Sequence, residues 1–104
     1  MSVNATAVLK KETKVDPGRP NDKTYRAVLS VLDEKGKEFG LPRYFNDFRE
    51  VAVLLARTAG VTHEQFHERF ASYERGERVS IPLTLSEEAI RNLGFDPNQE
   101  AMGH

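Results

Sequence analysis

The chain contains no cysteine and no tryptophan, and its longest apolar run covers only residues 51–56. Without cysteine, the protein can form neither a disulfide nor a thiolate zinc site, and it has no cysteine nucleophile. The apolar run is far shorter than the roughly 18 residues that a membrane-spanning helix needs. The first residues also lack the charged and apolar segments of a secretory signal. We therefore expect a small, soluble, cytoplasmic protein that does not bind membranes.

Neither sign of charge dominates the 104 residues, since 15 lysines and arginines oppose 16 aspartates and glutamates, for a net charge of −1. This balance excludes a protein that binds nucleic acid or membranes over its whole surface. Residues 10–26 differ, because six basic and three acidic side chains give this segment a net charge of +3. Such charges are typical of a solvated strand edge, and a contact with nucleic acid or an acidic protein is the alternative.

Alternating apolar residues predict β structure in the first third of the chain. Residues 2–13 and 24–32 alternate in the manner of strands, and the segment 14–22 between them is rich in turn-forming residues. A third short strand is expected at residues 37–41, after a turn that contains Gly36. Together these segments predict an antiparallel meander.

Two helices are expected in the middle of the chain. The first begins near Pro42, follows an apolar stripe with helical spacing and ends at Gly60. The second begins after Thr62, because Thr62 and Gln65 have the spacing of a capping box, and it ends at Gly76. Only about two residues join the helices, so they must form a tight corner or hairpin.

The last third predicts an edge strand and a short helix. Residues 78–85 alternate as a strand, but Pro82 removes one backbone donor and therefore predicts a strand at a sheet edge or a bulge. Ser86 is the expected cap of a helix that ends at Gly94. One shared core is expected to contain Phe45, Phe48, Leu55, Phe66, Phe70, Ile81 and Leu93.

The fold class that follows is α+β, with the element order β-β-(β)-α-α-β-α and a meander packed on a helical corner. The length allows one domain. We place this domain at residues 1–95 and expect a frayed tail at residues 96–104.

Residues 63–67 have the pattern H-E-x-x-H on the second expected helix. Histidines four residues apart share a helix face, so both could bind one zinc ion while the glutamate between them polarises water. The pattern resembles the signature of zincin metallopeptidases, which implies His63, His67 and Glu88 as zinc ligands and Glu64 as the catalytic residue. Glu68 and Arg69 stand where that family has uncharged and apolar residues. Their charges favour exposed histidines without zinc, and a minimal zinc metallohydrolase is an alternative.

Residues 55–66 resemble a helix-turn-helix, the helix pair of many DNA-binding proteins. This family has a small residue, a turn glycine and two apolar residues at fixed places. Here these places hold Ala56, Gly60, Val61 and Phe66. The resemblance implies base contacts by Gln65, His67 and Arg69 and phosphate contacts by Arg43, Arg49 and Arg57. Residues 61–77 carry four glutamates and only two arginines, however, and phosphate attraction dominates affinity for DNA. We therefore do not expect specific binding to nucleic acid.

No residue pattern predicts a complete catalytic set or a glycine-rich phosphate loop. The chain is also too small for a deep pocket, and its charges of both signs suit a surface that contacts another molecule. We interpret it as a non-enzymatic regulatory or accessory module that needs no cofactor and binds a macromolecular partner, in the first place a protein. A helix-turn-helix regulator and a zinc metallohydrolase are the alternatives, and the oligomeric state stays open.

Overall fold

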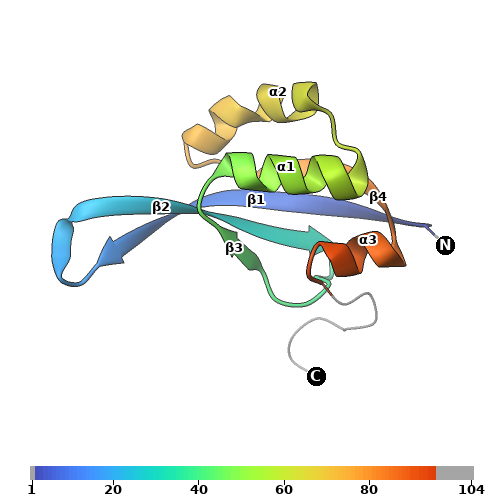
Figure 1. Cartoon of the computed structure of the whole chain (residues 1–104), viewed down its shortest axis with the longest axis horizontal. Helices are drawn as coiled ribbons and strands as arrows, with labels where there is room; N and C mark the ends of the chain where they lie inside the picture. The colour runs from blue at the N-terminus through green and yellow to red at the C-terminus, as the bar shows by residue number, and fades with distance from the viewer. Residues whose placement is uncertain (1, 96–104) are drawn as a thin grey trace.

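A four-stranded antiparallel sheet carries three helices (Figure 1). The computed structural model describes residues 2–95, and the tail expected at residues 96–104 lies outside this range. The elements are β1 (Ser2–Asp16), β2 (Arg19–Leu32), β3 (Arg43–Phe45), α1 (Phe48–Ala59), α2 (His63–Glu74), β4 (Val79–Ser86) and α3 (Glu87–Asn92). The strand order is β3-β2-β1-β4. The predicted α+β class is confirmed, and so is the meander, which β4 extends beside β1.

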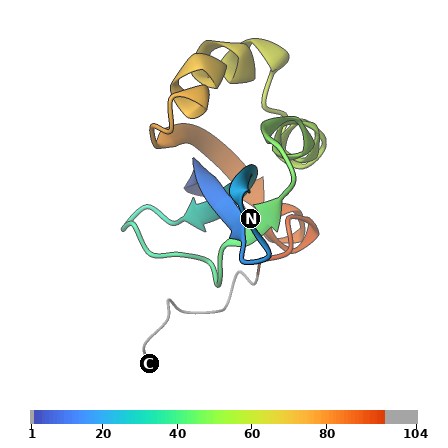
Figure 2. The ribbon, with the colours of Figure 1, turned by 90° about the vertical axis from the view of Figure 1, so that its left-hand side faces the viewer.

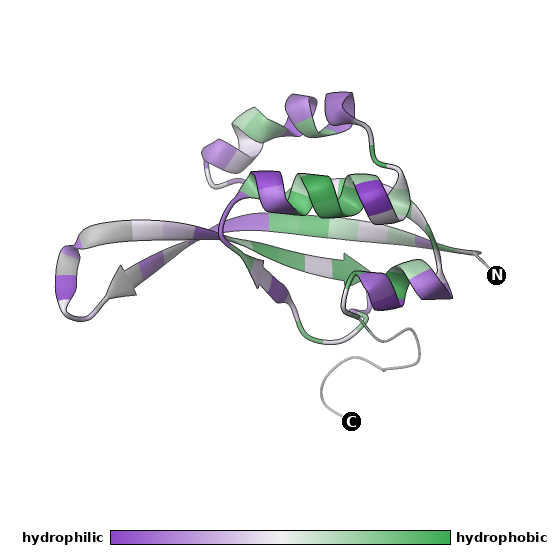
Figure 3. Ribbon diagram, viewed as in Figure 1, coloured by the Kyte–Doolittle hydropathy of each residue, from purple (hydrophilic) through white to green (hydrophobic). Residues whose placement is uncertain are grey.

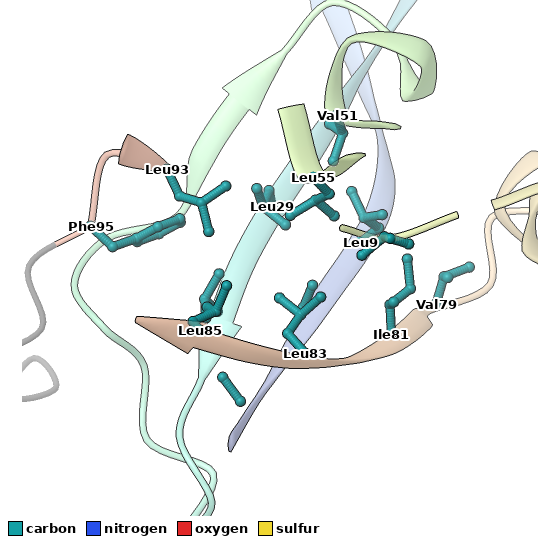
Figure 4. Close-up of a cluster of buried hydrophobic side chains, with 14 of the residues drawn as sticks. Leu9, Leu29, Val51, Leu55, Val79, Ile81, Leu83, Leu85, Leu93 and Phe95 are labelled. Atoms are coloured by element: carbon teal, nitrogen blue, oxygen red, sulfur yellow. The ribbon is translucent and has the colours of Figure 1, made fainter. Parts of the chain in front are cut away.

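One face of the sheet is buried, because side chains alternate between the two faces along each strand. Leu9 of β1 is paired with Leu29 of β2 and Val79 of β4, and all three are buried (Figure 4). In β4 the apolar residues are buried and the residues between them are exposed. Pro82 is one of the exposed residues, and β4 is an edge strand, as this proline predicts.

The helices cover the buried face unequally. α1 and α3 lie against it, and α2 lies on the other side of α1 from α3, where it also packs against β1 and β4 (Figures 1 and 2). Val51 and Leu55 of α1 and Ile90 of α3 are fully buried in the same core as the strand residues. Burial of such side chains stabilises the fold by about 1.5–3 kcal/mol each. No helix within residues 2–95 is long and apolar enough to cross a bilayer.

The helix ends follow the capping signals in the sequence. Gly60 closes α1 in the left-handed conformation, with a φ angle of 68°. At the start of α2, the Gln65 N–H donates to Thr62 Oγ1 at 3.3 Å and the Thr62 N–H donates to Gln65 Oε1 at 2.9 Å. The Ala89 N–H donates to Ser86 Oγ at 3.1 Å and starts α3. The predicted caps at Thr62 and Ser86 are therefore confirmed.

The hairpin between the first two strands is longer than the sequence predicts. The turn-rich segment 14–22 was expected to separate the strands, but only Pro17 and Gly18 lie between β1 and β2. Pairing continues to the partners Val15 and Lys23 before the register shifts next to the turn. Residues 20–22 fall within this register shift, so part of the turn-rich segment does interrupt the pairing.

The third strand is also misplaced by the sequence prediction. It lies at Arg43–Phe45 and not at residues 37–41. Asp33 holds the residues just before this stretch in a turn, since its side chain accepts the N–H groups of Lys35 at 2.8 Å and Lys37 at 2.9 Å. Within the stretch itself, Glu38 forms only an isolated bridge with Leu32. The hydrogen bond from Lys37 lowers the pKa of the Asp33 carboxyl below its usual value.

The start of α1 is the third correction. The helix begins at Phe48 and not near Pro42, because the Asp47 side chain accepts the Glu50 N–H at 2.9 Å and caps the helix there. Glu50 in turn accepts the Asn46 N–H at 3.1 Å. Asp47 and Glu50 have the spacing of a capping box, which is the signal in the sequence that marks this start.

Six of the seven predicted core residues belong to the core or pack against it. Five are buried, and Phe45 is partly buried against them. Phe70 is the error, because 42% of it is exposed. α2 has only α1 and the β1–β4 side of the sheet to pack against, so its buried side chains are Phe66 and Tyr73, and Phe70 lies at the margin of that contact.

The burial difference between two phenylalanines generates a stability prediction. Phe48→Ala should lower the free energy of unfolding by about 3–5 kcal/mol, because it leaves a cavity among buried rings. Phe70→Ala, the control, should lower it by about 1 kcal/mol, since this ring is half in water. Urea unfolding followed by circular dichroism measures both values. Equal losses for the two variants would contradict the assigned helix faces.

Candidate functional site

An apolar hollow of about 500 Å³ lies between α1 and α2. We call it the α1–α2 groove, and it is lined by Phe48, Arg49, Ala52, Val53, Ala56, His63, Phe66, His67 and Phe70. Five of these residues come from α1 and four from α2. Ala52 and Ala56 follow each other by one helical turn, and their small side chains leave the space that bulkier residues would fill. Ala56 is exposed in this groove, so it does not seal the helix corner that the sequence predicts.

The ring of Phe48 forms the floor of the groove. Its centroid lies 5.7 Å from that of Phe66 in an edge-to-face arrangement, 5.3 Å from Phe70 and 4.7 Å from Tyr73. Such aromatic pairs contribute about 0.5–1.5 kcal/mol beyond the burial of their area. Burial of Tyr73 in this cluster raises the pKa of its phenol above the usual value. One residue of α1 thus contacts three rings of α2 at the floor.

The walls of the groove expose apolar side chains beside positive or titratable ones. Val53 of α1 is 44% exposed and Phe70 of α2 is 42% exposed, and both line this one hollow. Arg49, His63 and His67 also line the groove, and no aspartate or glutamate does. The groove therefore combines an apolar surface with cationic and imidazole groups.

The H-E-x-x-H residues lie at the edge of this groove. His63 and His67 are exposed, and their ring centroids are 6.3 Å apart. Glu64 is exposed next to them, but Glu88 lies on α3, which α1 separates from α2 (Figures 1 and 2). Within residues 2–95, no three histidine, cysteine, aspartate or glutamate side chains come together in a way that could hold a metal ion. The structure thus brings together the histidines and Glu64 and leaves out the third ligand.

Three of the six residues that the helix-turn-helix resemblance implies are engaged within the chain. Gln65 belongs to the cap of α2. Arg69 donates to the Ser80 carbonyl of β4 at 3.0 Å and to the Gln65 carbonyl at 2.9 Å. Arg43 donates to the Leu93 carbonyl, with its guanidinium over the ring of Phe45.

The other three residues of that set are exposed. They are Arg49, Arg57 and His67. Arg49 and His67 line the groove, whereas Arg57 lies outside it. The surface of α2 beyond the groove carries Glu64 and Glu68. This helix therefore presents carboxylates where a recognition helix meets phosphates.

Sequence reasoning missed Val53 and Phe70 as surface residues of a site. Val53 falls outside the apolar stripe of α1, and an apolar side chain on the polar face of a helix is the signal that could have found it. Phe70 follows the helical spacing of the core and gives no such signal. No protein-family model, curated protein or solved structure matches the chain.

The separation of the histidines from Glu88 generates a prediction about zinc. A catalytic zinc site needs three protein ligands, and His63 and His67 supply two. We expect equal melting temperatures in the presence of zinc and in the presence of EDTA, measured by differential scanning fluorimetry. A rise in melting temperature with zinc that His67→Ala abolishes, while Glu68→Ala does not, would contradict this expectation.

Proposed function

We propose that the chain is a non-enzymatic binding module and that the α1–α2 groove takes an acidic amphipathic helix of a partner protein. The observation that carries the proposal is the pair of half-exposed apolar side chains, Val53 and Phe70, on opposite walls of one hollow. Half-exposed apolar residues contribute to binding when a partner removes them from water.

The shape of the groove supports a helix as its occupant. Two helices form its walls, and a third helix can place one apolar face between them in the helix-in-groove manner. Phe48 closes the floor and keeps the two walls at a fixed separation. A rigid groove favours affinity, because the partner loses freedom on binding and the module loses little.

The charges of the lining support an acidic partner. Arg49 provides a permanent positive charge, and the two histidines can only add to it. A carboxylate on the rim of the bound helix would be attracted to Arg49, whereas a lysine there would be repelled. No carboxylate belongs to the described lining, so the lining favours an acidic partner over a basic one.

A pair of synthetic peptides tests the proposal. The first is a helix of about 16 residues with leucine at helical spacing and glutamate elsewhere, and the second has lysine in place of glutamate. Fluorescence anisotropy should show tighter binding of the glutamate peptide. Phe70→Ser should weaken that binding about tenfold, which corresponds to about 1.4 kcal/mol.

Leu41→Ser is the matched control. Leu41 is 59% exposed, more than Phe70, and it does not line the groove. The variant removes apolar surface without touching the site, so the affinity for the glutamate peptide should stay at that of the parent protein. Equal binding of the two peptides, or an equal loss with Leu41→Ser, would contradict the proposal.

A further inference from the structure

The β1–β2 hairpin extends well beyond the rest of the sheet (Figure 1). Pairing of β1 with β4 ends at Leu9, and pairing of β2 with β3 begins at Ala27. Residues 10–26 therefore form a two-stranded ribbon whose strands pair only with each other. At about 3.4 Å per residue, the ribbon reaches roughly 20 Å out of the sheet.

Each face of the ribbon carries described side chains that are exposed to water. Lys10, Lys14 and Thr24 are exposed, and the ring of Tyr25 is 50% exposed. The described part of the ribbon is polar, in contrast to the apolar strands beneath the helices (Figure 3). An isolated two-stranded hairpin is only marginally stable in water. A partner that contacts the ribbon would therefore stabilise it.

Two contacts hold the base of the ribbon in place. Lys11 Nζ lies 3.1 Å from Glu74 Oε2 at the end of α2, and it also lies 4.3 Å from the centroid of the Tyr25 ring. On the other face, Arg26 donates to Glu12 and lies 4.0 Å from the centroid of the Tyr44 ring. Both contacts lie at the base of the ribbon, where it leaves the sheet.

The charge of the ribbon is opposite to that of the remaining chain. The ribbon carries +3 and the whole chain carries −1, so the remaining residues together carry −4. Lys10 and Lys14 lie on the same face of β1, since they are four residues apart in a strand. A net positive charge thus lies on a part of the sheet that projects from the rest of the molecule (Figure 1).

We propose that this ribbon binds the phosphate backbone of duplex DNA without sequence preference. A two-stranded β-ribbon fits the major groove, which is about 12 Å wide. Exposed lysines supply the attraction to phosphate that dominates nonspecific affinity. Phosphate contacts carry no sequence information, which agrees with the expectation that the chain does not bind specific sequences. The proposal concerns a different surface from the α1–α2 groove and does not depend on it.

The salt dependence of DNA binding tests this proposal. The probe is a labelled duplex of about 20 base pairs and mixed sequence, titrated with the full chain between about 50 and 200 mM salt. The variant Lys10→Gln/Lys14→Gln removes two cations from the ribbon. It should weaken binding and reduce the slope of log K against log salt concentration by about 1.8, since each phosphate contact contributes about 0.9.

The matched control is Lys35→Gln/Lys37→Gln, which makes the same change in charge on the exposed turn that follows β2. This turn lies at the other end of β2 from the ribbon tip, so the control should keep the slope and affinity of the parent. Circular dichroism checks that both variants are folded.

Three results would overturn the proposal. An equal loss in the control variant would show that only net charge matters. Preference for one sequence, with an affinity tighter than about 10⁻⁷ M, would require base contacts. Binding to vesicles of phosphatidylserine and phosphatidylcholine but not to the duplex would make an anionic membrane the ligand. Binding of the glutamate peptide, measured with the same ribbon variant, reports on the groove separately.

Discussion

The packing of Phe48 against three aromatic rings of α2 is the contact on which the position of that helix depends. Only two side chains of α2 are buried, so the helix offers little other apolar surface to the sheet. Arg69 adds a hydrogen bond to the Ser80 carbonyl at 3.0 Å, which ties the same helix to β4. The position of α2 then determines two further features. It sets the width of the α1–α2 groove, and it places Glu74 beside Lys11 at the base of the ribbon.

The length of the apolar alternation in β1 and β2 explains why the ribbon projects. The alternation provides buried residues up to Leu9 in β1 and from Ala27 onward in β2. Beyond these points the positions on the same face hold Lys11, Thr13 and Tyr25. These side chains offer a helix less apolar surface to bury than the residues beneath α1 do, and Lys11 meets the end of α2 through its ion pair with Glu74. Thr13 and Tyr25 are therefore exposed to water.

Features that depend on a few neighbouring residues could be predicted from the sequence. The capping box at Thr62, the left-handed Gly60 and the edge position of the Pro82 strand are examples, because each follows from local chemistry. Features that depend on distant partners could not. Helical spacing places Phe70 on the core side, but the extent of the neighbouring elements decides how much of it is covered. Likewise, the spacing of residues 63–67 pairs two histidines, while a third metal ligand has to come from another element.

The acidic surface of α2 would keep the two proposed partners apart. Glu64 and Glu68 are exposed on the side of the histidines away from the groove. These carboxylates would repel DNA that is bound along the ribbon. They would also repel an acidic helix, which would be attracted only by Arg49, inside the groove. Lys11 and Glu74 pair the base of the ribbon with the end of α2, so the two surfaces belong to elements that contact each other. A chain built in this way could hold a protein at a defined position beside a nucleic acid without binding either through the same residues.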